Sequence, residues 1–201
     1  MWELYKRRPG IVLGFHGCDE QVGESVLAGK RSLGTSTNDY DWLGNGVYFW
    51  EGNPARALHF AKQATQKDQR VTRGKVRKPF VIGAIIDLGY CCNLVDSDAL
   101  SELKVAYDYL AEMASNAGEA VPANRGADND LKARFRDCLV IETMHRLRET
   151  EELQPYDTVR CPFWEGGELY PGAGFTTQAH IQIAVRTPKS ILGYFRPIKR
   201  N

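Results

Sequence analysis

Two short segments that combine glycine with a hydrogen-bonding or aromatic residue most constrain the fold of this 201-residue chain. The first reads FHGC at residues 15–18, where an apolar run that predicts a strand over 11–15 ends. The second reads GNGVYF at residues 44–49 and leads into a strand predicted over 47–50. Glycine lets a ligand or another backbone approach closely, so polar side chains beside it are typical of a ligand cleft rather than of a core.

The composition is that of an ordinary soluble globular protein, with 43% hydrophobic and 25% charged residues. The length suits one compact domain, so we expect a single domain over residues 1–201. No stretch approaches the roughly 18 to 20 apolar residues of a membrane span, and the first eight residues lack the apolar core of a signal peptide. The five cysteines are scattered without a Cys-x-x-Cys pair. We therefore expect a cytoplasmic protein with no membrane contact, no disulfide and no metal.

Hydrophobic periodicity predicts alternating short strands and helices with no internal repeat. Strands are expected over 11–15, 47–50, 80–88, 158–163, 180–185 and 190–195, and helices over 19–27, from Pro54 to about 64, 99–114 and 131–148. Asp19 and Asn53 are placed to cap the first two helices. Two acids of the last helix, Asp137 and Glu142, are interpreted as surface or helix-terminal charges.

A basic stretch from Lys62 to Lys78 stands out on a chain whose formal net charge is only +1. Its basic residues include Arg70, Arg73, Lys75 and Arg77, against the single acid Asp68. A solvated surface connection explains such a stretch, and so does a docking site for an anionic partner such as RNA. Charge alone does not decide between the two interpretations.

The order of these parts resembles the ADP-ribosyltransferase fold of poly(ADP-ribose) polymerases and of the diphtheria-toxin type. In that family a strand ends in His-Gly and a Gly-x-Gly-[Ile/Val]-Tyr-Phe segment follows, as His16-Gly17 and the segment 44–49 do here. The chain also looks like small bacterial proteins that share a Tyr-Pro-Gly-x-Gly-Phe loop followed by His-Ile-Gln-Ile. The resemblance implies an α+β domain whose two small, mainly antiparallel sheets frame an NAD cleft, with helices outside.

The resemblance also implies roles for single residues in holding NAD. His16 would bond a ribose hydroxyl, and the backbone of Gly17 would bind the nicotinamide carboxamide as donor and acceptor. Tyr48 would stack on the nicotinamide ring, which is cationic in NAD, so that stacking gains a cation–π contribution. By spacing, the second aromatic wall falls at His59, or at Phe60 if the helix is shifted by one residue.

The chain departs from the family at the later strand, where a glutamate is usual. Residues 177–185 read TQAHIQIAV and contain no carboxylate. Strand alternation puts His180 and Gln182 on one face, and Gln182 is the first choice for the glutamate position. A glutamine accepts a hydrogen bond from a ribose hydroxyl but cannot take a proton, whereas His180 can. Glu165 and Glu168, in the preceding loop, are the other candidates to replace the acid.

The expected activity is NAD-dependent mono-ADP-ribosyl transfer by a bacterial toxin or phage-defence effector, a glycosyltransferase that releases nicotinamide. The acceptor is RNA or protein, the basic stretch favours RNA, and an antitoxin protein is a possible further partner. The loop that carries Trp164, Glu165, Glu168 and Tyr170 would select the acceptor. Two alternatives remain open: a non-catalytic module that binds ADP-ribose or nucleic acid, and an NAD glycohydrolase that uses water as acceptor.

Overall fold

The computed structural model describes residues 10–66, 76–126 and 132–198. Its elements, in chain order, are β1 (Ile11–Asp19), α1 (Glu20–Leu27), β2 (Val47–Glu51), α2 (Pro54–Gln63), β3 (Pro79–Asp87), β4 (Cys91–Asn93), α3 (Ser97–Asn116), α4 (Phe135–Thr150), β5 (Thr158–Phe163), β6 (His180–Val185), the short 3-10 helix η2 (Pro188–Ser190) and β7 (Ile191–Phe195). Every strand and helix predicted above is present, and the short β4 was not predicted. β1 continues through the His16-Gly17 pair instead of ending before it.

The capping residues act as their positions in the sequence predict. The Asp19 carboxylate accepts from the backbone N–H of Gln21 at 3.0 Å at the start of α1. The Asn53 side chain accepts from the N–H of Arg56 at 2.9 Å at the start of α2, where Pro54 takes the first helical position. α1 therefore begins directly after β1, and α2 begins after a two-residue turn that follows β2.

The strands of the described residues form one seven-stranded mixed sheet in the order β4-β5-β6-β2-β1-β3-β7. Only β4 and β5 pair in parallel. The α+β class is confirmed, but the expected two separate sheets are instead joined by hydrogen bonding. The connection is narrow: β1 pairs with β3 along nine residues, and with β2 only at Gly14↔Glu51 and Phe15↔Trp50. We call these two pairs the seam.

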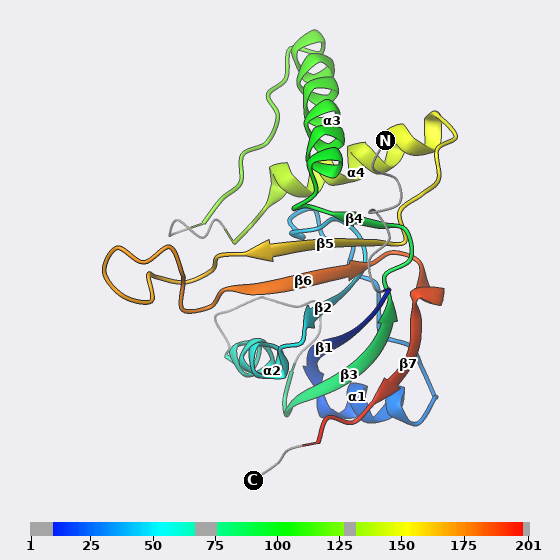
Figure 1. The fold of residues 1–201 in the computed structure, drawn as a ribbon, viewed down its shortest axis with the longest axis vertical. Coiled ribbons are helices and arrows are strands. Elements are labelled where there is room, and N and C mark those ends of the chain that lie inside the picture. Colours follow the sequence, from blue (N-terminus) through cyan, green and yellow to red (C-terminus); the bar gives the residue numbers. More distant parts are fainter. Residues whose placement is uncertain (1–9, 67–75, 127–131, 199–201) are drawn as a thin grey trace.

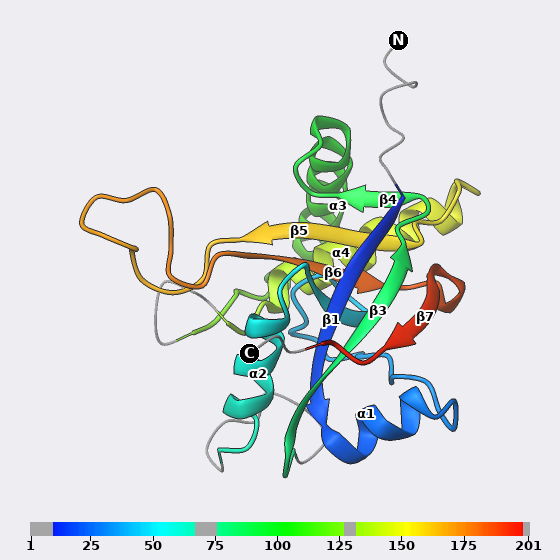
Figure 2. The same cartoon turned by 60° about the horizontal axis from the view of Figure 1, so that its bottom comes forward.

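Away from the seam, β4, β5 and β6 run in one direction and β1, β3 and β7 in a clearly different one (Figures 1 and 2). One group is β4-β5-β6-β2 and the other is β1-β3-β7. Because strands in a sheet twist against their neighbours, a seam of two pairs lets the groups diverge within one sheet. The expectation of two separate sheets is thus not met, because the strands on both sides of the seam belong to one sheet.

Helices cover both faces of the sheet. Phe15, Trp50 and Ala57 pack together, which places α2 over β1 and β3 on the face toward which Phe15 points. α3 and α4 lie on that same face over β5 and β6, where Ile141 packs with Ala184. α1 covers the opposite face. Among the helices of the described ranges, none combines the length and the apolar character that crossing a membrane requires.

Candidate functional site

The seam ends where the two sequence segments face each other. The carbonyl oxygen of Leu13 accepts from the N–H of Gly52 at 2.9 Å, so the polar backbone groups of Leu13 point toward β2. In an extended strand the backbone N–H and C=O groups of every second residue point to the same side. The backbone groups of Phe15 and Gly17 therefore also point toward β2. Recorded β1–β2 pairing stops at Phe15. The Gly17 backbone therefore faces the side on which β2 diverges, opposite Tyr48.

Gly17 also has a packing reason to be glycine. A Cβ at this position would lie 2.1 Å from the backbone oxygen of Ala57, because α2 packs directly on the strand here. Any other residue would push the helix away. This contact closes the face of the sheet over Gly17, whose backbone is buried.

His16 bridges the two strands immediately beyond the seam. Its Nδ1 lies 2.8 Å from the backbone oxygen of Tyr48 and therefore carries the proton that it donates. The ring is on the face opposite to Gly17 and contacts the Phe49 ring edge-on, with centroids 5.9 Å apart. Burial lowers the His16 pKa, although the bond to Tyr48 opposes this. His16 is thus neutral, with Nε2 as its hydrogen-bond acceptor.

Tyr48 is held by its hydroxyl. That hydroxyl donates to the carbonyl oxygen of Gly44 at 2.6 Å and accepts from the N–H of Leu43 at 2.9 Å. The ring packs with the core beneath α3 and α4, and burial raises its pKa well above the ordinary value. Tyr48 therefore fixes the loop that precedes its own strand, and its hydroxyl is fully used inside the protein.

Glu142 anchors the GNG segment, contrary to its interpretation as a surface or helix-terminal charge. It accepts from the N–H of Asn45 at 2.7 Å, from Asn45 Nδ2 at 3.0 Å and from Arg186 Nη1 at 2.6 Å. Burial opposes ionisation of Glu142, but the bonds from Arg186 and Asn45 prevail and lower its pKa. Gly44, with φ +71°, would place a Cβ 2.3 Å from Glu142 Oε1. Glycine is thus required there by both backbone conformation and space. Asp137 lies in the first turn of α4, as expected of a helix-terminal charge.

The register of β6 places Gln182 close to the seam. Gln182 pairs with Trp50, which in turn pairs with Phe15, so all three side chains share one face. Phe15, the member of this row on β1, is two residues from Gly17, which corresponds to roughly 6 to 7 Å along the strand. Gln182 is half-buried, and no hydrogen bond to its side chain occurs within the described residues. His180 lies one row further from the seam on the same face.

His180 lies in an aromatic box. Its ring centroid is 6.3 Å from that of Trp42, 6.4 Å from that of Trp50 and 5.8 Å from that of Phe163. Nδ1 donates to the carbonyl oxygen of Gln178 at 2.7 Å, which fixes the tautomer and leaves Nε2 unprotonated. Burial lowers the His180 pKa, although the bond to Gln178 opposes this. The Nε2 atom is buried without a hydrogen-bond partner in the described part of the chain.

A buried ion pair closes one side of the box. Glu165 is 7% exposed, and its Oε2 accepts from Arg56 Nη2 on α2. Glu165 Oε2 lies 3.9 Å from His180 Nδ1, and Oε1 lies 3.8 Å from Lys132 Nζ. Glu165 is therefore the carboxylate that the fold brings beside His180. Glu168 is exposed and instead accepts from the N–H of Gly172 within its own loop, at 2.9 Å.

Unbonded buried polar atoms concentrate around this ion pair. Eight side-chain nitrogen or oxygen atoms of the described residues are buried without a partner, and five belong to this region: Trp50 Nε1, Arg56 Nε, Thr176 Oγ1, Gln178 Oε1 and His180 Nε2. Buried polar groups in folded proteins are nearly always hydrogen-bonded. A water molecule or a polar ligand at this place would meet groups that lack hydrogen-bond partners within the described residues.

The remaining predicted residues are more scattered. Phe60 packs on the Trp50 ring with centroids 5.0 Å apart, whereas His59 is exposed and its Nδ1 lies 3.4 Å from Arg56 Nη1. Trp164 and Tyr170 are 60% and 55% exposed on the loop that protrudes between β5 and β6 (Figure 2).

Of the basic stretch, only its two ends are described. Arg77 is exposed, and its N–H donates to Asp19 Oδ2 at 2.8 Å. Arg70, Arg73 and Lys75 lie outside the described residues. The docking role predicted for the stretch therefore rests on its charge alone.

Sequence reasoning missed Arg56 and the aromatic box of Trp42, Trp50 and Phe163. Trp50 carried a usable signal, since it is two residues beyond Tyr48 and shares its face. The other three come from separate parts of the chain and meet only through the fold. No group of three or more His, Cys, Asp or Glu side chains that would hold a metal occurs among residues 10–66, 76–126 and 132–198. No family model matches the chain, and no curated protein or solved structure matches it.

Proposed function

We propose that this protein is an NAD-dependent mono-ADP-ribosyltransferase, a bacterial toxin or phage-defence effector that transfers ADP-ribose to RNA or protein and releases nicotinamide. One observation carries the proposal: β1 and β2 diverge at the two segments on which the resemblance rests. At that divergence the N–H and C=O of Gly17 face the Tyr48 side, as binding of a carboxamide requires.

The orphaned polar atoms beside the seam fit a ligand with many hydroxyl and amide groups. His16 keeps Nε2 as an acceptor, since its Nδ1 is occupied by Tyr48, but its ring lies on the face opposite to Gln182, so it would bond a ribose hydroxyl that enters between β1 and β2. Phe60 is the better of the two candidates for the second aromatic wall, because it packs on Trp50 while His59 is exposed. Bound NAD supplies the ADP-ribosyl group and the nicotinamide leaving group. In this assignment Tyr48 contributes the face of its ring only.

The chemistry requires one bond to break and one to form at the ribose C1′ atom. Nicotinamide leaves with the electrons of its bond to C1′, and the acceptor oxygen or nitrogen bonds to C1′ and gives up a proton. Gln182 holds a ribose hydroxyl by accepting its hydrogen bond. The lone pair of His180 Nε2 takes the proton, and Glu165 offsets the positive charge that then forms on the imidazole.

The lack of a carboxylate at Gln182 favours a single transfer over chain elongation. Each elongation step must deprotonate a sugar hydroxyl, a poor nucleophile that needs a strong base at the site. Trp164 and Tyr170, exposed on the protruding loop, are proposed to contact the acceptor. RNA is favoured by the charge of Arg70, Arg73, Lys75 and Arg77. An antitoxin that covers the cleft would be the corresponding protein partner.

The test is incubation of the purified chain with labelled NAD and a whole-cell lysate, followed by separate ribonuclease and protease digestion. Ribonuclease-sensitive label identifies RNA as acceptor, and protease-sensitive label identifies protein. We expect His180→Asn to retain folding and lose labelling, because asparagine keeps a donor for Gln178 but has no basic nitrogen. Arg146→Ala, a change on the exposed side of α4, serves as control. Full labelling by His180→Asn would overturn the assigned proton acceptor.

A non-catalytic module that binds ADP-ribose is the second candidate, and one observation favours it. His16 Nδ1 and the Tyr48 hydroxyl are both used inside the protein, which suits a fixed binding surface. Calorimetric binding of ADP-ribose with no release of nicotinamide from NAD would establish this function. Release of nicotinamide without any labelled macromolecule would instead identify an NAD glycohydrolase.

A further inference from the structure

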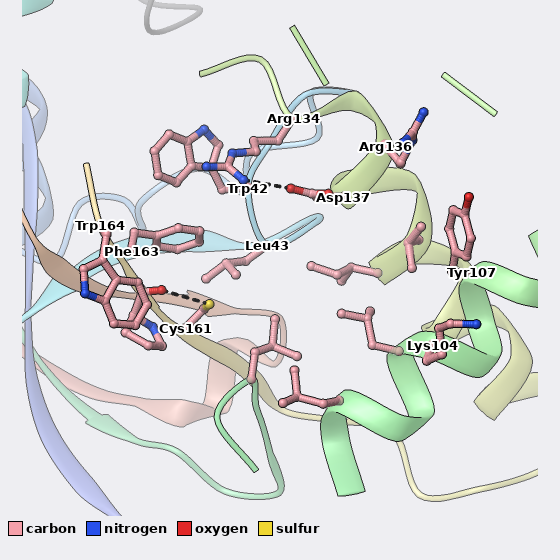
Figure 3. A pocket seen from close by; sticks show the side chains of 16 residues that line it. Trp42, Leu43, Lys104, Tyr107, Arg134, Arg136, Asp137, Cys161, Phe163 and Trp164 are labelled. Atoms are coloured by element: carbon pink, nitrogen blue, oxygen red, sulfur yellow. Dashed lines mark hydrogen bonds and ion pairs between the residues drawn. The ribbon is translucent and has the colours of Figure 1, made fainter. Parts of the chain in front are cut away.

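An apolar groove lies on the other side of the aromatic box from His180. It has a volume of about 620 Å³ and opens between α3, the start of α4 and the end of β5 (Figure 3). This volume is within the range of small-molecule sites. Its lining combines apolar side chains, among them Leu43, Val140 and Ile141, with the cations Lys104 and Arg136 at its edge.

The floor and walls of the groove offer apolar contact. Leu43, Val140 and Ile141 are buried side chains that reach its surface. Cys161 also lines the groove. Burial raises the pKa of its thiol to about 11, so the thiol is neutral and adds no charge to this lining. Leu100 at the edge is 47% exposed. An alkyl or aryl group placed here would cover apolar surface that now faces solvent.

The rim of the groove is positively charged. Lys104, Arg134 and Arg136 line it, against the single carboxylate of Asp137. That carboxylate already has partners, since it accepts from Arg134 Nη1 at 3.1 Å and from Asn124 Nδ2 at 2.8 Å. Lys104 is paired with Asp108 and Arg134 with Asp137, so among the described residues the rim charge left for a ligand anion to balance is that of Arg136.

Arg136, at the edge of the groove, is the rim cation that has no carboxylate partner among the described residues. Its Nε donates to the carbonyl oxygen of Pro122 at 2.9 Å, which fixes the base of the guanidinium. Its two terminal nitrogens have no carboxylate partner within the described residues. Lys104 holds Asp108 at 2.6 Å in an exposed i,i+4 pair, which is a weak contact that an incoming anion can replace.

We propose that this groove binds an amphipathic anion, a free molecule with an alkyl or aryl body and one carboxylate or phosphate group. The apolar body lies against Leu43, Val140 and Ile141, and the anionic group meets Arg136. Trp42 and Phe163 form the wall shared with the His180 box, and the Arg134 guanidinium lies over both rings at 4.8 and 5.9 Å. A ligand in the groove therefore contacts two of the rings that surround His180.

Three ten-carbon probes of different charge test the proposal: decanoate, decanol and decyltrimethylammonium. Each is titrated into the full chain by isothermal calorimetry below its micelle concentration. We expect decanoate to bind at one site per chain, the neutral alcohol to bind more weakly and the cation to bind weakest. Tighter or equal binding of the cation would overturn the charge assignment, and no binding of any probe would overturn the site.

Two variants locate the binding. Arg136→Glu should weaken decanoate by roughly tenfold, because it reverses the charge that meets the carboxylate. Arg146→Glu makes the same change on α4 outside the groove and should leave binding unchanged. Leu103→Trp fills the groove and should abolish binding of all three probes, with Leu100→Trp at the exposed edge as a milder replacement if Leu103→Trp fails to fold. Unchanged binding in Arg136→Glu and in the folded tryptophan variant would overturn the proposal.

A further arm separates a free anion from a membrane surface. The chain is mixed with vesicles of phosphatidylglycerol and sedimented. Sedimentation with the vesicles in the absence of calorimetric decanoate binding would contradict a site for a free anion. Decanoate binding without sedimentation supports it.

Discussion

His16 and His180 make the same hydrogen bond in two very different parts of the molecule. Each donates from Nδ1 to a backbone carbonyl oxygen, at 2.8 and 2.7 Å, and burial lowers the pKa of each. His16 lies on β1 beside β2. Its side chain, in place of a backbone N–H of β1, hydrogen-bonds the carbonyl oxygen of Tyr48. His180 lies at the end of β6 among three aromatic rings, with its Nε2 buried and unbonded within the described chain.

The difference separates a histidine that holds two strands together from a histidine whose second ring nitrogen is buried and unbonded within the described chain. Backbone pairing and close packing around Gly17 support the His16 region, so its side chain can bridge strands and still offer an acceptor. The His180 region is supported by a side-chain ion pair between α2 and the protruding loop. We therefore expect the stability of the His180 region to depend mainly on its side chains. The stability of the His16 region should depend mainly on its backbone geometry.

The largest effect is expected from Arg56→Met. Among the described residues it leaves the buried Glu165 carboxylate with Lys132, 3.8 Å away, as its one lysine or arginine partner. Removing one partner of a buried ion pair should lower the free energy of unfolding by about 3 kcal/mol, measured by urea denaturation. Lys104→Met breaks the exposed pair with Asp108 and is the control, with an expected loss of about 0.5 kcal/mol or less. Similar losses in both variants would remove the distinction drawn for the His180 region.

Gly17→Ala tests the His16 region through its backbone. The added methyl would meet the backbone oxygen of Ala57, which cannot rotate away as a side chain can. Overpacking of this kind should cost about 2 kcal/mol of stability. Gly34→Ala, where no atom lies within 4 Å of the added Cβ, is the matched control for the loss of a glycine. A stable Gly17→Ala protein would show that α2 moves freely over the strand.

The pH dependence of stability compares the two histidines directly. A lowered folded-state pKa means that the unfolded chain binds the proton first as pH falls below about 6.5, so stability decreases with falling pH in that range. His145, whose pKa burial lowers to about 4, contributes in the same direction down to that pH. His16→Asn and His180→Asn should each reduce the slope by up to about 1.4 kcal/mol per pH unit. An unchanged slope in either variant would mean that folding does not lower the pKa of its histidine.

Tyr48→Phe should have the smallest effect. It removes the hydroxyl that donates to Gly44 and accepts from Leu43, and we expect a loss of about 1 kcal/mol in thermal or urea unfolding. The ring itself is kept, so nicotinamide release should continue at a similar rate. Abolished turnover in a folded Tyr48→Phe protein would instead give the hydroxyl a role at the reacting centre.

Periodicity and capping were enough to predict most of the fold. The apolar run of β3, the cap at Asn53 and the alternation of β6 each reflect local physics that a sequence displays directly. The narrow seam was not predictable, because it depends on where β1 and β2 diverge, which no local pattern records. The same holds for Glu142, whose partners Asn45 and Arg186 are distant along the chain.

The candidate site was predictable only in part for the same reason. His180, Gln182 and Glu165 were identified as polar residues near one strand, and the resemblance supplied His16, Gly17 and Tyr48. Arg56 gave no signal, since an arginine on a helix is ordinarily a surface residue. Its role appears only when α2 and the loop after β5 are brought together.

The seam also makes this sheet mechanically uneven. A nine-residue ladder binds β1 to β3, while two residue pairs bind β1 to β2. A small rotation of one half against the other strains few hydrogen bonds, so the sheet has a built-in line of bending that passes beside Gly17. Two cysteines introduced across that line would lock the bend, and the rigidity of the whole domain would then be under redox control.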